Sequence, residues 1–251
     1  MASFEGFWAE FRRNSIPRWP ENRIILAFVI IGLFALGFND VLVLGPLKDP
    51  DVGYEPIVLL FSAIGALIAV YVNVLVQKAF ALRRGIQAVA SWNPLKLALG
   101  ALISLFSYGF APVVFPPDLD AKIKPYQRIG KWRYEVNLKD YAKMGVAGLI
   151  ANLIVASVFA GFGMADPLTR AIVIASAFCA LGTILPVPRS PGFFLLFTSF
   201  VYYAIVLGLA AIGVVLVYSG SLGIAFSLGF AMLVLFWAFV VFQVDKIIDI
   251  R

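Results

Sequence analysis

Residues 57–76 read IVLLFSAIGALIAVYVNVLV, a run of twenty residues without a charged side chain. An α-helix rises about 1.5 Å per residue, so a run of this length crosses the ~30 Å hydrocarbon core of a bilayer. The composition agrees, because 62% of the 251 residues are hydrophobic and only 14% are charged. In soluble domains, roughly 45–50% of the residues are hydrophobic and about 25% are charged. The sequence therefore predicts a multi-pass membrane protein.

Apolar runs of similar length recur on both sides of this stretch. They cover residues 24–44, 144–164, 171–188, 193–218 and 222–242. Within lipid every backbone polar group must be paired inside the structure, and the connections between these runs are too short for a barrel. We expect an all-α integral membrane protein with about six transmembrane helices, which form a single domain over residues 24–250.

Residues 97–115 form a further apolar segment, but glycine, serine and proline interrupt it at 100, 104, 107, 109 and 112. Cytoplasmic loops of membrane proteins are rich in Lys and Arg. If this segment crossed the membrane, residues 118–143 with their seven Lys and Arg would lie outside. A re-entrant segment keeps this basic loop and both termini on the cytoplasmic side, so we predict that path in the cell membrane.

The N-terminal residues 1–23 combine aromatic and basic side chains. Phe4, Phe7, Trp8 and Phe11 fall on one stripe of a helix, and arginines follow at 12, 13, 18 and 23. This pattern is typical of an amphipathic helix in the membrane interface. Packing against cytosolic loops of the protein itself explains the stripe equally well.

The residue inventory narrows the possible chemistry. The chain has no histidine and a single cysteine, Cys179, so it lacks the commonest metal ligand and cannot form an internal disulfide. No nucleotide or phosphate-binding motif stands out. The net charge of +6 indicates orientation and contact with anionic membrane lipids before it indicates nucleic acid. We expect no cofactor, no bound metal and no nucleic-acid partner.

Three segments, in order, resemble motifs of the site-2 protease family of intramembrane zinc metalloproteases. NVLVQ at residues 73–77, followed by Arg83-Arg84-Gly85, fits the frame of the family's H-E-x-x-H motif. AGLIANL at residues 147–153 is similar to the family's A-G-P-x-x-N-L, and TILPVPRSPG at residues 183–192 is similar to N-x-x-P-x-P-x-x-D-G. The resemblance covers about residues 55–195 and implies a site-2-protease-like core.

The departures from these motifs concern the chemistry itself. The resemblance implies that Asn73, Gln77 and Pro191 stand at the zinc-ligand positions and that Val74 stands at the general-base position. A catalytic zinc needs three imidazole, thiolate or carboxylate ligands, and valine cannot take a proton from water. The resemblance therefore implies a pseudoprotease rather than an enzyme, and the missing histidines argue against a protease with relocated ligands.

The polar residues of these motifs allow two interpretations. Asn73 and Gln77 lie four residues apart on one helix face, and Asn152 is the natural partner for hydrogen bonds between helices. In that case Asn73, Val74, Gln77, Asn152 and Pro191 serve helix packing. Alternatively, they retain a pocket that binds a client transmembrane segment without cutting it.

Two functions follow. The first is a non-catalytic scaffold that binds transmembrane helices or a membrane complex, with lipids as its other partner. The alternative is a small transporter or channel that uses Asp40 and the re-entrant segment, because ionisable groups inside lipid often mark ion or proton pathways. However, Asp40 lies about 24 Å along a helix that starts at Ile24, which favours a solvated position near the outer surface.

Overall fold

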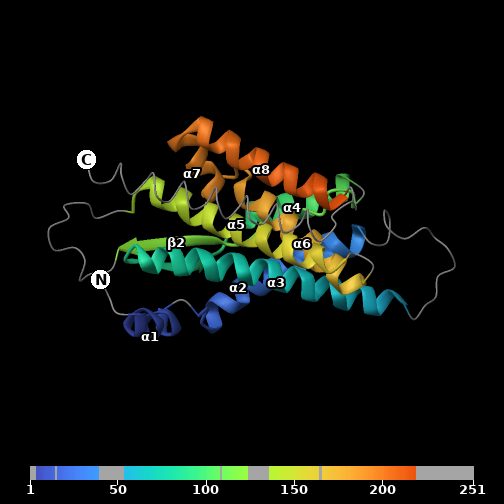
Figure 1. Ribbon diagram of the computed structural model, residues 1–251, viewed down its shortest axis with the longest axis horizontal. Helices are drawn as coiled ribbons and strands as arrows, with labels where there is room; N and C mark the ends of the chain where they lie inside the picture. The colour runs from blue at the N-terminus through green and yellow to red at the C-terminus, as the bar shows by residue number, and fades with distance from the viewer. Residues whose placement is uncertain are drawn as a thin grey trace.

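The computed structural model is a bundle of long helices that packs against a short two-stranded sheet (Figure 1). It describes residues 4–14, 16–39, 54–107, 109–123, 136–163 and 166–218. The elements are α1 (Phe4–Asn14), α2 (Trp19–Asn39), α3 (Tyr54–Arg83), β1 (Ile86–Ser91), α4 (Pro94–Phe106), β2 (Asp118–Ile123), α5 (Leu138–Gly161), α6 (Pro167–Ile184), α7 (Pro191–Thr198) and α8 (Phe200–Tyr218).

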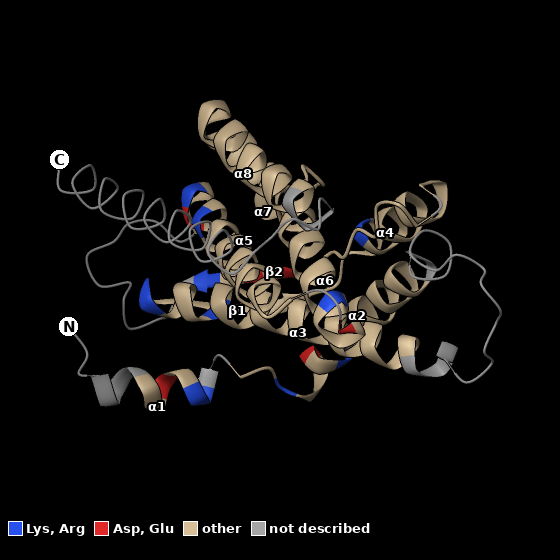
Figure 2. Ribbon diagram, turned by 45° about the vertical axis from the view of Figure 1, so that its right-hand side comes forward, with Lys and Arg blue, Asp and Glu red and all other residues tan. Residues whose placement is uncertain are grey.

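Four helices in the described part of the chain are long and apolar enough to cross a membrane: Trp19–Gly37, Val58–Arg83, Leu138–Gly161 and Pro167–Ile184. Figure 2 shows Lys and Arg on α1, at the sheet and at the start of α5, with further ones on α4 and near the start of α6. These helices support a membrane protein. Of the two remaining predicted spans, 222–242 lies outside the described residues.

The predicted span 193–218 is wrong as a single helix. The chain breaks at Ser199, whose backbone is extended with φ −163° and ψ 110°. The Ser199 N–H donates to Leu195 O at 3.0 Å and ends α7, whereas its hydroxyl accepts from the Tyr202 N–H at 3.4 Å and caps α8. A serine cap stabilises the start of a new helix, which hydropathy does not register.

Two helices extend beyond their apolar runs because their polar residues have partners. α2 begins at Trp19 rather than at 24, and the Glu21 carboxylate accepts from the Arg18 N–H at 3.3 Å. α3 continues to Arg83 because the buried Lys78 ammonium pairs with Glu21 at 2.5 Å. Lys78, which hydropathy places at a cytoplasmic boundary, thus lies inside the bundle.

The all-α prediction is also wrong in one respect, since β1 and β2 pair antiparallel with Ile86 opposite Ile123 and Ser91 opposite Asp118. Gly85 turns the chain out of α3 with φ 74°. Burial then alternates along β1, with buried residues at 86, 88 and 90. A strand of six residues that contains two alanines carries little β propensity, so the sequence did not reveal it.

α4 follows β1 and precedes β2 along the chain, and it accounts for the path of the interrupted apolar segment 97–115. The pairing of Ser91 with Asp118 brings the start and the end of residues 92–117 together. α4 has 13 residues and rises about 20 Å, which is too short to cross a bilayer. The chain therefore returns to the sheet that it left, and the re-entrant path of this segment through the membrane stays a prediction.

The core lies where α3, α5 and α6 approach one another closely. A Cβ added at Gly65 of α3 would lie 2.7 Å from the carbonyl oxygen of Ala171 in α6. A Cβ added at Gly148 of α5 would lie 2.8 Å from the Gln77 side chain of α3. Small residues let membrane helices approach in this way, and the contact places polar groups from all three helices side by side.

Candidate functional site

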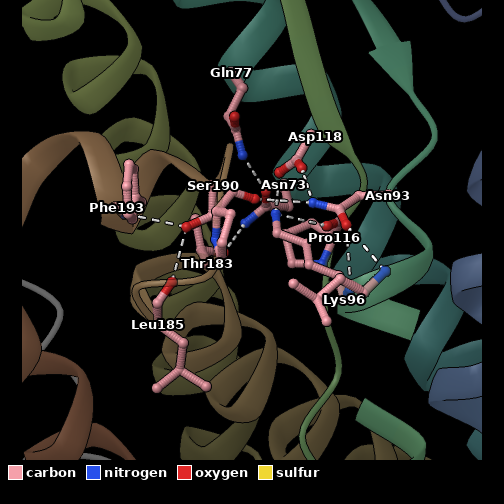
Figure 3. A network of polar contacts seen from close by, with 12 residues as sticks. Asn73, Gln77, Asn93, Lys96, Pro116, Asp118, Thr183, Leu185, Ser190 and Phe193 are labelled. Atoms are coloured by element: carbon pink, nitrogen blue, oxygen red, sulfur yellow. Dashed lines mark hydrogen bonds and ion pairs between the residues drawn. The ribbon is translucent and has the colours of Figure 1, made fainter. Parts of the chain in front are cut away.

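Asn73, Gln77 and Thr183 form a buried group that we call the amide cluster (Figure 3). Gln77 Nε2 donates to Asn73 Oδ1 one turn away on α3. Asn73 Nδ2 donates across to Thr183 Oγ1 on α6 at 3.0 Å, and this hydroxyl donates to Cys179 O at 2.7 Å. The chain of hydrogen bonds links α3 to α6 and ends on a backbone carbonyl.

The face of α5 opposite this cluster carries two glycines one turn apart. A Cβ at Gly148 would lie 2.8 Å from Gln77 Nε2 and 3.0 Å from Asn73 Oδ1. A Cβ at Gly145 would overlap Pro191 Cβ at the start of α7. The positions that the motif comparison pairs, 73, 77 and 191, thus lie against the same short stretch of α5.

The prediction that Asn152 is the hydrogen-bond partner of Asn73 and Gln77 is wrong. Its side chain is fully buried one turn beyond Gly148 and lies beside the Cys179 thiol. Yet neither Asn152 Nδ2 nor Oδ1 makes a hydrogen bond of ordinary geometry to any described residue. The reason is register, because Gly148 rather than Asn152 faces Asn73 and Gln77, so that α6 supplies the hydroxyl partner instead.

Val74 and Pro191 have structural surroundings. Val74 is fully buried in the hydrophobic core of the bundle. Pro191 is the first residue of α7, and Ser190 before it caps the helix by accepting from the Phe193 N–H at 3.1 Å. The Ser190 hydroxyl donates to Leu185 O at 2.9 Å. The motif position 191 is therefore the start of α7, and the two hydrogen bonds of the Ser190 hydroxyl fix this start.

A second polar group, which we call the charged cluster, consists of Asn93, Lys96 and Asp118 (Figure 3). Lys96 and Asp118 are both buried and form an ion pair, and Lys96 Nζ also donates to Pro116 O at 3.4 Å. Asn93 Nδ2 donates to Asp118 Oδ2 at 2.5 Å, while Asn93 Oδ1 caps α4. The cluster closes the base of residues 92–117.

The turn between α6 and α7 brings the two clusters together. Asn93 Nδ2 donates to Pro188 O at 3.1 Å, which ties the charged cluster to this turn. The turn is tight, because Arg189 has φ 68° and a Cβ at Gly192 would overlap Ile184 O. Thr183 of the amide cluster lies at the other end of the same turn.

Sequence reasoning missed the charged cluster altogether. A signal was available, since Lys96 stands in an otherwise apolar helix just after the cap Asn93-Pro94. Ionisable residues within membrane segments usually have a named partner. Asp40, the one ionisable residue singled out from sequence, lies outside the described residues.

The side chains present do not fit a zinc ion. Carboxamides are neutral and bind zinc poorly, proline and valine offer no ligand, and Lys96 and Asn93 already occupy the Asp118 carboxylate. Among the described residues, no three His, Cys, Asp or Glu side chains are grouped closely enough to hold a metal ion. The site can form hydrogen bonds between helices, and Asn152 has unused capacity to form more.

No family model, curated protein or solved structure matches the chain.

Proposed function

We propose that the chain is a non-catalytic, site-2-protease-like membrane protein that binds or scaffolds transmembrane partners. One observation carries the proposal. Positions 73, 77 and 191 lie against one stretch of α5 around Gly145 and Gly148, yet they hold amides and a proline. A site in which these three positions lie together, but which lacks metal ligands, is better suited to binding a transmembrane helix than to hydrolysing it.

Asn152 is the group best placed to recognise a partner. Its carboxamide offers one donor group and one acceptor, as a peptide group does, and both are unpaired within the described residues. A buried polar group without a partner costs about 1–3 kcal/mol. Because Asn152 is fully buried, a partner helix reaches it only by displacing a neighbouring helix of the bundle, and a polar side chain or an open backbone group supplied at this depth would then remove that cost.

The outer surface suits contacts with other helices. Leu26, Ile30 and Phe34 recur every four residues on α2, and each is about half exposed. On α8, Val201 and Val215 are exposed by 68% and 65%. Apolar faces of this kind pack against lipid or against partner helices, as the proposal requires.

The test is recovery of the partner with and without the recognition group. The tagged full-length chain is cross-linked in native membranes, and the proteins that co-purify are identified by mass spectrometry. Asn152→Leu should lose the partner without destabilising the isolated chain, because neither polar atom of Asn152 makes a hydrogen bond of ordinary geometry to a described residue. Gly208→Ala on α8 is the control, since a Cβ there meets nothing within 4 Å. Equal recovery with both variants would reject the proposal.

The proposal also predicts that the protein holds no stoichiometric transition metal. Elemental analysis of washed, purified protein measures this directly. One zinc per chain, lost on changing Cys179 or Asp40, would show that a metal site exists after all and that the protein is not a pseudoprotease.

A second candidate function is transport, and the charged cluster favours it. A buried Lys96–Asp118 pair inside a membrane bundle is expensive to maintain, and such groups often line ion or proton pathways. Proteoliposomes with an internal pH-sensitive dye would report proton flux. Flux that Asp118→Asn abolishes would support a transporter, whereas tight vesicles would reject proton transport.

A further inference from the structure

Arginines gather where α1, the start of α2 and the end of α3 meet. Arg12, Arg13, Arg18, Arg23 and Arg83 are all exposed, and we call this set the basic collar. Contacts between α1 and α3 and the pairing of Glu21 on α2 with Lys78 on α3 hold these elements at one end of the bundle. The positive charges therefore share one rim of the molecule.

The five arginines of this rim outnumber the carboxylates near them, among which Glu10 on α1 has an interaction of its own. Glu21 is buried and paired with Lys78 at 2.5 Å, and Asp140 lies 3.8 Å from Arg84. No member of the collar forms an ion pair with an acidic residue of the described chain. The collar thus presents surplus positive charge to its surroundings.

Large apolar side chains are interleaved with these arginines. Trp8, Ile16 and Trp19 are exposed by 46%, 52% and 70%. The Arg23 guanidinium lies over the Trp19 ring at 5.5 Å from its centroid. Tryptophan and arginine together favour the headgroup level of a bilayer, where the indole is half in lipid and the cation meets phosphate.

The direction of α1 fits this level. α1 is foreshortened in Figure 1, where α3 runs along the horizontal, and it is seen along its length in Figure 2. It therefore runs across the long helices rather than alongside them. If α3 spans the bilayer, α1 lies along its surface, with Trp8 and the adjacent Arg12 and Arg13 at headgroup depth.

We propose that the basic collar binds the phosphate headgroups of anionic lipids and that α1 lies in the membrane interface. The lipid bilayer is the single occupant, because the exposed tryptophans need an apolar phase that a soluble anion does not provide. The inference goes beyond the proposed function and does not depend on it, since a transporter or a scaffold would bind lipid in the same way.

The test places a fluorophore at Ala9→Cys in the full-length chain, where the native Cys179 is buried. The protein is reconstituted in nanodiscs that contain spin-labelled phosphatidylglycerol or spin-labelled phosphatidylcholine at equal mole fraction. Quenching by the anionic lipid should exceed quenching by the neutral lipid. Each arginine near an anionic leaflet strengthens association about fivefold, so Arg12→Gln, Arg13→Gln and Arg18→Gln together should remove the preference.

Two controls keep the experiment decisive. Replacing the same three arginines by lysine should preserve the preference, and Arg170→Gln on α6, outside the collar, should leave it unchanged. Inorganic phosphate should reduce it no more than chloride does at equal ionic strength, because a lipid site needs the bilayer. Equal quenching by both lipids, weak quenching by either, or competition by phosphate would overturn the proposal.

Discussion

The amide cluster and the charged cluster lie at the same turn of the fold, but they differ in what their removal leaves behind. Asn73, Gln77 and Thr183 are neutral, and their hydrogen bonds end on a backbone carbonyl. Lys96 and Asp118 are oppositely charged, and each compensates the other inside the bundle. The charged pair therefore holds the sheet to residues 92–117, and losing one of its members leaves a buried charge, whereas losing a member of the neutral cluster leaves none.

The largest effect is expected from breaking the charged pair. Lys96→Met leaves the Asp118 carboxylate buried without its cation, and such losses cost about 3–5 kcal/mol. The double change Lys96→Met with Asp118→Leu should recover most of this, because no charge is left behind. Unfolding by SDS in detergent micelles measures both. If the double variant is as unstable as the single one, the pair stabilises the fold by more than the neutralisation of each charge by the other.

A smaller loss of stability is expected from a substitution where α5 touches Pro191. Gly145→Ala adds a methyl group that overlaps Pro191 Cβ, and overpacking of this kind costs about 1–3 kcal/mol. Gly208→Ala is the matched control on α8, where the added methyl group meets open space. Alanine favours helix over glycine, so this variant should be neutral or slightly stabilised. Equal unfolding of the two variants would contradict the close approach of α5 and α7.

Substitutions in the amide cluster should reduce the stability by a still smaller amount. Hydrogen bonds between membrane helices average about 0.6 kcal/mol and reach about 1.7. Asn73→Leu and Thr183→Val should each lose an amount in this range, and the double variant should lose less than their sum because they share one bond. A double-mutant cycle measures the coupling. Strict additivity would show that the Asn73–Thr183 bond adds nothing to stability.

The smallest effect, with the opposite sign, is expected at Asn152. If Asn152 were the partner of Asn73, as the sequence predicts, Asn152→Leu would destabilise the protein. Since the Asn152 carboxamide has no partner in the described structure, its removal should leave stability unchanged or raise it by about 1 kcal/mol. A clear loss in the isolated protein would show that Asn152 does have an internal partner.

Part of the candidate site could be predicted from the sequence. Asn73 and Gln77 share a helix face and do bond to one another, because a spacing of four residues is a local property. The role of Thr183 could not be predicted, since it depends on how α6 is shifted against α3. Lys96 and Asp118 were missed because each looks like an isolated charge until the strand pairing brings residues 91 and 118 together.

By itself the sequence determined that this is a membrane protein with long apolar helices and without histidine chemistry. Hydrophobic length and residue inventory are properties of the chain that no packing can alter. The tertiary structure alone decided the two strands, the break at Ser199, the burial of Lys78 and the choice of Thr183 over Asn152. Each of these depends on which distant backbone or side chain meets a given residue, and a polar group in an apolar bundle takes the nearest partner that the packing provides.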